Sequence, residues 1–370
     1  MQRAAADGGG EVAGIARRRL RTQRLTGKPF ATPVDAVRWL GAVQSQDYGG
    51  AKWALAQRTR GVTDAAIDRL YDEGAVLRTH VMRPTWHFVV PEDIRWMLEL
   101  TGPKIRRALA ARYRALELDE ETVARALVAF RSALTGGGHM TRPELGEVLN
   151  AAKISPAGQR LPHLLMSAEL EGVIVSGPRR GKQHTFALLD ERGPKGRVLE
   201  RAEAVAELTL RYFRSHGPAQ VQDFAWWSGL TMADARAGIA AAGPALEHEV
   251  LDRTDFWSDA AAPRVNHKGP VAHLLPNFDE YTVGYRDRAG VVHPDHSVDP
   301  ALFSFGSILS NIVTVDGRVR GAWRRALVRD RVIVEIKTMR RMDRADSQAV
   351  EEAARRLGRF LGRPVVVSGL

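Results

Sequence analysis

The segment from residue 136 to residue 188 constrains the fold most tightly, because its order of helices and strands can be read directly. GGGHMTRPELGEVLN places Thr141 as a helix cap, Pro143 early in the helix and Glu144 three residues after the cap, which is a capping box. QRLPHLLMSAELEG predicts a second amphipathic helix that ends at Gly172. Two β-branched runs then flank the basic turn GPRRGK. A helix-turn-helix followed by a β-ribbon is the order of a winged-helix module.

The same order of elements recurs on both sides of this segment. On the N-terminal side, Thr32 caps one predicted helix, which runs into the sequence VQSQDYGG, and Thr63 caps another. VLRTHVMRPTWHFVV then predicts two strands joined by a turn at Arg83-Pro84. On the C-terminal side, residues 208–242 predict two or three short helices before the strand EHEVLDR. Repetition of one supersecondary unit indicates tandem modules.

The C-terminal part has a different character. VAHLLPNFDEYTVGY and NIVTVDGRVRGAWRRALVRDRVIVEIKTM are strand-rich, Asp316-Gly317 is a strong hairpin signal, and a last helix is predicted near residues 347–361. We therefore predict an α+β chain. Its predicted domains are a disordered leader at 1–10, winged-helix modules at 11–130, 131–197 and 198–268, and a β-rich region with a terminal helix at 269–370.

The charge of the chain indicates its class of partner. The formal net charge is +11, and clustered Lys and Arg bind nucleic acid or an anionic surface by releasing counterions. The alternative is a basic chain from an Arg-rich genome. No cysteine is present, which excludes disulfides, iron–sulfur clusters and thiol nucleophiles. No run approaches the roughly 20 apolar residues of a membrane helix, so we expect a soluble cytoplasmic protein with no membrane partner.

Common catalytic motifs are absent from the sequence. It contains no Walker loop, HExxH or GxSxG pattern. His80 and His87 lie seven residues apart without clustered carboxylates, so we expect no metal and no cofactor. Asp279 and Glu280 are adjacent and on a strand would face opposite ways, which excludes an acid–base pair on one substrate face. We expect them to be polar anchors instead.

A pair of glutamines is the remaining candidate. Gln44 and Gln46 lie in VQSQDYGGAKWALAQRT. On a continuing helix their side chains would diverge by about 200°, but a helix end or an extended turn before the Gly49-Gly50 break would let both amides point into one cleft. The alternative is that they bond loose backbone groups at a helix end.

Four stretches together carry a resemblance to a known family. VQSQDYGGAKWALAQRT, LRTHVMRPTWHFVVPEDIRWML, LLPNFDEYTVGYRDR and VDGRVRGAWRR resemble the bacterial AlkZ-like (YcaQ-type) DNA glycosylases. The resemblance implies three tandem winged-helix modules in a C shape and a catalytic Gln-x-Gln at Gln44 and Gln46. Ser45 stands where the family usually has an aliphatic residue. It also implies excision of N7-alkylated purines and unhooking of interstrand crosslinks, so the expected partner is duplex DNA with alkylated or crosslinked guanine.

Such a lesion suits a weak catalyst. N7 alkylation gives guanine a positive charge, so the base leaves without a general acid. The enzyme then has to hold a water near C1′ and stabilise oxocarbenium-like charge, which neutral amides can do. We expect a monofunctional glycosylase that is selective for labile cationic lesions.

The resemblance also implies where DNA is bound. The predicted DNA-binding residues are Lys52, His80, Arg83, Trp86, Arg179, Arg180 and Lys182. The wing cations among them would contact phosphates without reading sequence, or they are simply solvated hairpin charges. Residues 284–300 are the candidate loop for probing a groove.

Two other functions remain open at this point. A winged-helix transcriptional regulator would bind an operator as a dimer through a recognition helix, although no dimerisation helix is evident. A lesion-binding protein would protect DNA without excision. Three modules make a monomer sufficient, and fold alone does not decide function.

Overall fold

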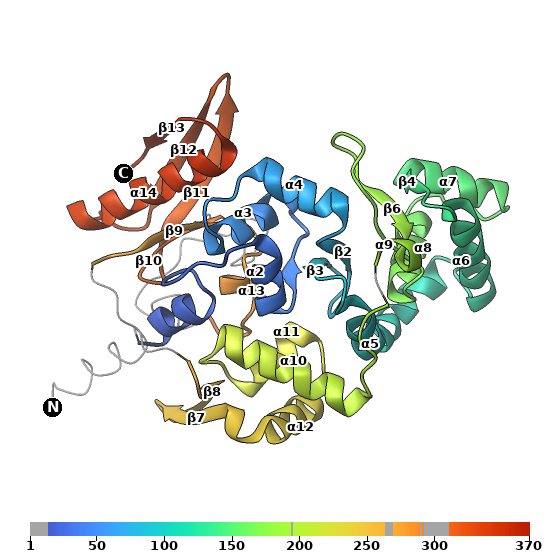
Figure 1. Ribbon diagram of the computed structural model, residues 1–370, viewed down its shortest axis with the longest axis horizontal. Coiled ribbons are helices and arrows are strands. Elements are labelled where there is room, and N and C mark those ends of the chain that lie inside the picture. The colour runs from blue at the N-terminus through green and yellow to red at the C-terminus, as the bar shows by residue number, and fades with distance from the viewer. Residues whose placement is uncertain (1–13, 194, 263–268, 289–290, 292–310) are drawn as a thin grey trace. The chain divides into compact units, whose positions relative to one another are not determined.

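The computed structural model describes residues 14–193, 195–262, 269–288, 291 and 311–370 (Figure 1). The predicted leader at 1–10 and most of the predicted groove-probing loop at 284–300 lie outside these residues. The fold is mixed α+β, as predicted. Backbone contacts divide the chain into two compact units. Unit 1 comprises Met1–Ile67, Ala206–Trp227 and Thr231–Leu370, and unit 2 comprises Asp68–Val205 and Ser228–Leu230. The division into successive modules stays a prediction.

The N-terminal part of unit 1 holds three short elements in a row. They are α2 (Pro33–Leu40), β1 (Val43–Gln44) and α3 (Tyr48–Arg58). Thr32 caps α2 as predicted, but this helix ends at Leu40 and Gly41 follows with φ of 81°, so it does not run into the glutamines. The predicted break at Gly49-Gly50 is wrong as well. Asp47 caps α3 by accepting from the N–H of Gly50 at 3.0 Å, which places both glycines in the first helical turn.

The C-terminal part of unit 1 is a five-stranded sheet with the order β13-β12-β11-β10-β9. The strands are β9 (Ala272–Leu275), β10 (Ile312–Val315), β11 (Arg318–Val328), β12 (Arg331–Thr338) and β13 (Val365–Ser368). The hairpin at Asp316-Gly317 is confirmed, since it joins the antiparallel strands β10 and β11. The predicted terminal helix is α14 (Arg344–Leu361), which packs on β9, β10 and β13 (Figure 1).

The rest of unit 1 joins these parts. Its elements are most of α10 (Arg201–His216), α11 (Val221–Ser228) up to Trp227, α12 (Met232–Ala242), η1 (Gly243–Ala245), β7 (Leu246–Leu251), β8 (Thr254–Asp259) and α13 (Glu280–Val283). The predicted strand EHEVLDR is β7, which pairs with β8. Asp279 and Glu280 are not on a strand, because Asp279 caps α13 through the N–H of Tyr281.

Unit 2 contains the segment with the clearest sequence signals. Its elements are the end of α4 (Asp64–Glu73), β2 (Leu77–His80), β3 (Trp86–Val89), α5 (Ile94–Ala115), α6 (Glu120–Leu134), β4 (His139–Thr141), α7 (Arg142–Ala151), α8 (Arg160–Leu170), β5 (Ile174–Ser176), β6 (Thr185–Leu188) and α9 (Leu189–Arg192). The capping box of Thr141 and Glu144 is confirmed at the start of α7. The predicted hairpins are confirmed as the antiparallel pairs β2–β3 and β5–β6.

Candidate active site

The glutamine pair spans the end of a short strand and the bend that follows it, between α2 and α3. Gln44 ends β1 and is only 7% exposed, Ser45 is fully buried, and Gln46 is exposed. The helical geometry that would separate the two amides is therefore absent. The pair directly precedes Asp47, the cap of α3, so Gln46 lies at a helix N-terminus, where backbone N–H groups carry partial positive charge.

A buried carboxylate holds the backbone of Gln44 in place. Oε1 of Glu280 accepts from the N–H of Gln44 at 2.9 Å, and Oε2 accepts from Nε1 of Trp227 at 2.8 Å. Nε2 of His216 lies 3.3 Å from the same Oε2. Burial lowers the pKa of His216, so its ring is neutral near pH 7 and donates one N–H to Glu280. Because a buried carboxylate is costly without such partners, this arrangement fixes Glu280 and Gln44 together.

Asp279 fixes the helix that carries Glu280. Arg58 donates to both carboxylate oxygens of Asp279, from Nη1 at 2.9 Å and from Nη2 at 2.8 Å, and both side chains are fully buried. The guanidinium also donates from Nη2 to Oε1 of Gln23 at 2.7 Å. A bidentate pair of hydrogen bonds between a guanidinium and a carboxylate is strong and directional. Asp279 is thus the polar anchor that we expected, whereas Glu280 reaches the candidate catalytic segment, which sequence reasoning missed.

A cation of the C-terminal sheet lies beside the same segment. Arg325 is exposed on β11, and a Cβ built at Gly49 would lie 3.6 Å from its Nη2. The neighbouring Arg324 is paired with Glu335 at 2.6 Å. Arg325 belongs to the stretch VDGRVRGAWRR, but nothing in the pattern of that stretch predicts that this residue lies near Gly49.

The predicted DNA-binding residues of unit 1 and the first hairpin are mostly covered. Lys52, on α3, is 5% exposed and pairs with Asp64 at 2.8 Å, so it is not available as a free surface cation. His80 is buried, and its Nδ1 donates to the carboxylate of Glu169. Trp86 is half-buried and Arg83 is half-buried at the turn of the β2–β3 hairpin.

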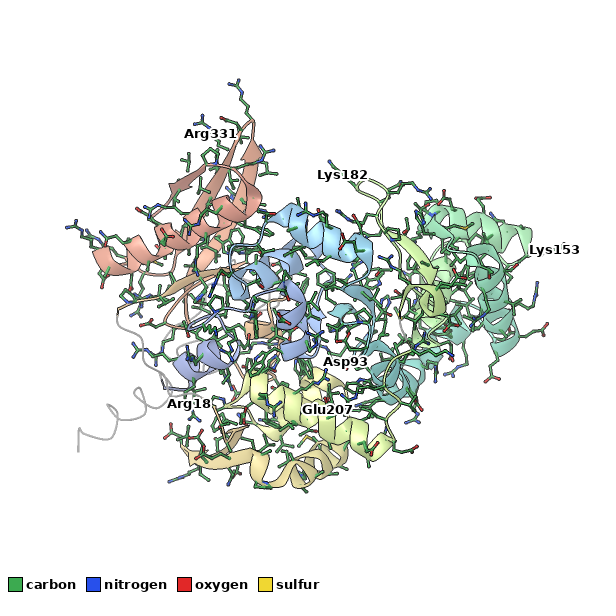
Figure 2. All side chains as sticks on the ribbon, viewed as in Figure 1. Arg18, Asp93, Lys153, Lys182, Glu207 and Arg331 are labelled. Atoms are coloured by element: carbon green, nitrogen blue, oxygen red, sulfur yellow. The ribbon has the colours of Figure 1, made fainter. Side chains whose placement is uncertain are left out.

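The cations of the second basic turn differ in exposure and in their carboxylate partners. Arg179 is held by Asp68 at 3.1 Å and by Asp72 at 3.2 Å, which engages it within unit 2. Arg180 and Lys182 are both exposed, and Lys182 is labelled on this turn in Figure 2. Arg180 pairs with Glu144 at 2.6 Å. Hydrogen bonds from the Thr141 backbone and from Arg180 lower the pKa of Glu144 to about 2.

The part of the chain that the structure describes has neither a cluster of metal-ligating side chains nor a membrane-spanning helix. No group of three or more His, Asp or Glu side chains there is placed to hold a metal ion. No helix there is long and apolar enough to cross a membrane.

Comparison with known proteins identifies the family. A family model of AlkZ-like DNA glycosylases matches residues 37–360. The chain belongs to this family. A Streptomyces sahachiroi protein named interstrand DNA cross-link repair glycosylase is 27% identical over 366 residues, covering 93% of this chain and 95% of the relative. The structure of the Streptomyces sahachiroi DNA glycosylase AlkZ has the same fold, with a TM-score of 0.78 at 23% identity, covering 96% of this chain and 99% of that chain.

Membership in the AlkZ-like family decides between the functions that the sequence left open. The protein is a DNA glycosylase, as the four stretches implied. The alternatives of a transcriptional regulator and of a lesion-binding protein without excision are not supported.

Proposed function

We propose that this glycosylase hydrolyses the N-glycosidic bond of N7-alkylated purines, in single adducts and in interstrand crosslinks, with Gln44 and Gln46 as its catalytic residues. One observation carries the proposal. Gln44 ends a short strand and Glu280 holds its backbone N–H, and Gln46 is exposed two residues later, just before α3. The name of the Streptomyces sahachiroi relative, interstrand DNA cross-link repair glycosylase, supports crosslinks as substrates.

The chemistry of the lesion fits two neutral amides. An N7-alkylated purine already carries the charge that a general acid would otherwise supply, so bond cleavage leaves a neutral base. An amide oxygen can orient a water toward C1′, and the amide dipole can stabilise the cationic sugar. Both tasks depend on position, which explains why a buried network supports the segment of Gln44.

We further propose that the chain binds duplex DNA as a monomer through three winged-helix modules. The order of helices and hairpins supports the modules. Exposed Arg180 and Lys182 on the second hairpin and Arg325 beside Gly49 are the cations best placed for phosphates. Lys52 and Arg179 would first have to leave their carboxylate partners, and we assign them no direct contact. Arg83, His80 and Trp86 stay proposed DNA contacts.

Substrate preference tests the proposed function. We expect purified protein to excise N7-methylguanine from a duplex well above spontaneous depurination, because this base leaves as a neutral molecule. Uracil and hypoxanthine should stay at background, since neither carries a positive charge. Alkali cleavage of the resulting abasic sites measures all three. Comparable rates on the neutral lesions would contradict the proposal, because they require a general acid that Gln44 and Gln46 cannot supply.

Salt dependence tests the second hairpin. The double variant Arg180→Ala, Lys182→Ala should weaken duplex binding and flatten the plot of log affinity against log salt by roughly 0.9 per lost phosphate contact. The control is Lys104→Ala, Arg107→Ala, which removes two exposed cations from α5. Equal slopes for the two double variants would show that the hairpin makes no specific phosphate contact.

A further inference from the structure

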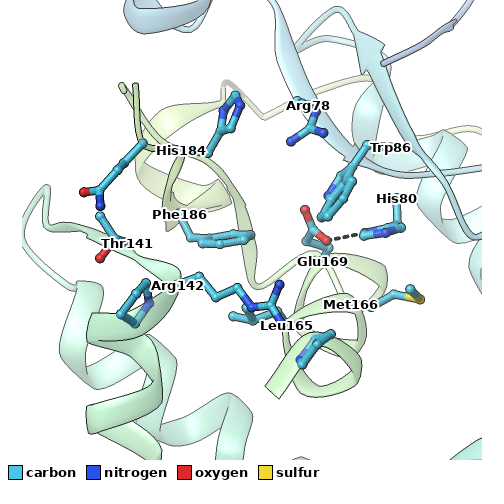
Figure 3. A pocket seen from close by; sticks show the side chains of 13 residues that line it. Arg78, His80, Trp86, Thr141, Arg142, Leu165, Met166, Glu169, His184 and Phe186 are labelled. Atoms are coloured by element: carbon cyan, nitrogen blue, oxygen red, sulfur yellow. Dashed lines mark hydrogen bonds and ion pairs between the residues drawn. The ribbon is translucent and has the colours of Figure 1, made fainter. Parts of the chain in front are cut away.

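Unit 2 contains a cavity that the proposed chemistry does not use. Its volume is about 370 Å³, within the range of roughly 300–1,000 Å³ that is typical of small-molecule sites. The lining comes from β2, β3, α7, α8 and β6, together with residues next to them (Figure 3). Every lining residue belongs to unit 2, whereas Gln44 and Gln46 belong to unit 1.

The walls of the cavity suit a flat apolar surface. Trp86 and Phe186 contribute aromatic rings, and Leu165 and Met166 contribute aliphatic groups. His80 lies against Trp86 with 4.6 Å between ring centroids. Aromatic faces of this kind stack with planar ligands, which adds to the free energy of burying their area.

A carboxylate with spare hydrogen-bonding capacity faces the same space. Glu169 is 1% exposed and lines the cavity. One of its oxygens, Oε2, accepts from His80, and Oε1 accepts no hydrogen bond from the residues that the structure describes. A carboxylate offers about four acceptor positions, so Glu169 can take further donors. A ligand in this cavity is therefore expected to present N–H groups.

Two guanidinium groups complement this acceptor. The labelled side chains of Arg78, Arg142 and Glu169 turn toward the same space in Figure 3. Arg78 lies 4.3 Å above the ring of Trp86. Burial and the charge of Arg78 lower the pKa of His184 to about 4, so this histidine is neutral near pH 7. The cavity thus combines an acceptor, two strong donors and a stacking surface, and its cations disfavour a positively charged ligand.

We propose that this cavity binds a guanine-type purine base. The Watson–Crick edge of guanine presents an amide N–H and an amino group side by side, and the Glu169 carboxylate accepts hydrogen bonds from both. The neighbouring carbonyl O6 accepts from Arg78 or Arg142, and the ring packs against Phe186 and Trp86. The choice of guanine rests in part on the proposed function, which generates this base. The binding itself is independent of excision, so each can fail separately.

Calorimetric titration tests the site directly. Free N7-methylguanine and guanosine should bind saturably to the wild-type protein. Purine riboside, which lacks the exocyclic donor and acceptor, should bind at least tenfold more weakly. Glu169→Gln should weaken guanosine binding roughly tenfold or more, because a hydrogen bond to a charged group is lost. Arg142→Met removes an exposed donor and should weaken binding without endangering the fold.

Matched controls separate the site from general effects. Glu171→Gln changes the same residue type two positions further along, at an exposed place outside this cavity, and should leave binding unchanged. Absence of saturable binding to the folded wild type would overturn the proposal. So would equal binding of purine riboside, or unchanged affinity in both Glu169→Gln and Arg142→Met.

Competition then identifies the source of the base. If a single-stranded oligonucleotide containing deoxyguanosine displaces guanosine, and Arg142→Met weakens that competition, the site takes unstacked bases from DNA. If only free bases and nucleosides compete, the site takes the released product. Both results keep the site, and they assign it to different steps.

Discussion

Gln46→Ala is expected to lower the rate of N7-methylguanine excision by about 10²-fold or more, with little change in duplex affinity. Removal of one preorganised polar group from a transition state costs about 10²–10³-fold in other enzymes. Gln46 is exposed, so its truncation leaves no cavity. Gln44→Ala should lower excision similarly, but Gln44 is buried, and its rate has to be measured where thermal unfolding shows a folded protein.

The combination of variants decides whether the glutamines act as a unit. The double variant Gln44→Ala, Gln46→Ala should excise only slightly more slowly than the less active of the two single variants, because groups that position one water do not contribute additively. Gln46→Asp should retain excision, since a carboxylate oxygen can also orient water. Gln159→Ala is the control, an exposed glutamine of unit 2. Full excision by the double alanine variant would remove the proposed catalytic role.

Local signals in the sequence were sufficient for many elements. The capping box at Thr141 and the turn at Asp316-Gly317 depend on residues within a few positions of each other, so both could be predicted. The start of α3 could not be predicted in this way. Two glycines disfavour a helix by propensity, yet the Asp47 cap stabilises the first turn of α3. A Cβ at Gly50 would lie 2.8 Å from Oδ2 of Asp47 and 3.3 Å from Cβ of Pro276. Close packing therefore explains why a residue without a Cβ occupies position 50.

The missed part of the candidate site is tertiary. Glu280 lies 236 residues from Gln44 in the sequence, and no periodicity connects them. Pairing of Arg179 with Asp68 and Asp72 likewise spans distant segments, so the basic turn carries less unpaired charge than its residue types predict. Residue types were predictable here, whereas their partners required the folded chain.

Glu280→Gln is expected to lower excision by tens-fold while duplex affinity is retained. The amide would present an NH₂ group to at least one of the donors that now meet the carboxylate, namely the N–H of Gln44, Nε1 of Trp227 and Nε2 of His216. One unsatisfied buried donor costs about 1–3 kcal/mol, and the strain falls on the segment that carries Gln44. Glu280 thus acts as a positioning residue, and single-turnover excision should fall more than binding.

A second buried carboxylate of unit 1 provides the matched control. Asp223 is fully buried and accepts from the N–H groups of Arg286 and Asp287 at 3.0 Å each, without a contact to Gln44 among the described residues. Asp223→Asn should lower the melting temperature by a similar amount but leave excision by the folded protein near wild type. Equal loss of excision in Asp223→Asn and Glu280→Gln at matched stability would mean that Glu280 supports only the fold. Loss confined to Glu280→Gln would show that the buried carboxylate positions Gln44 for the reaction.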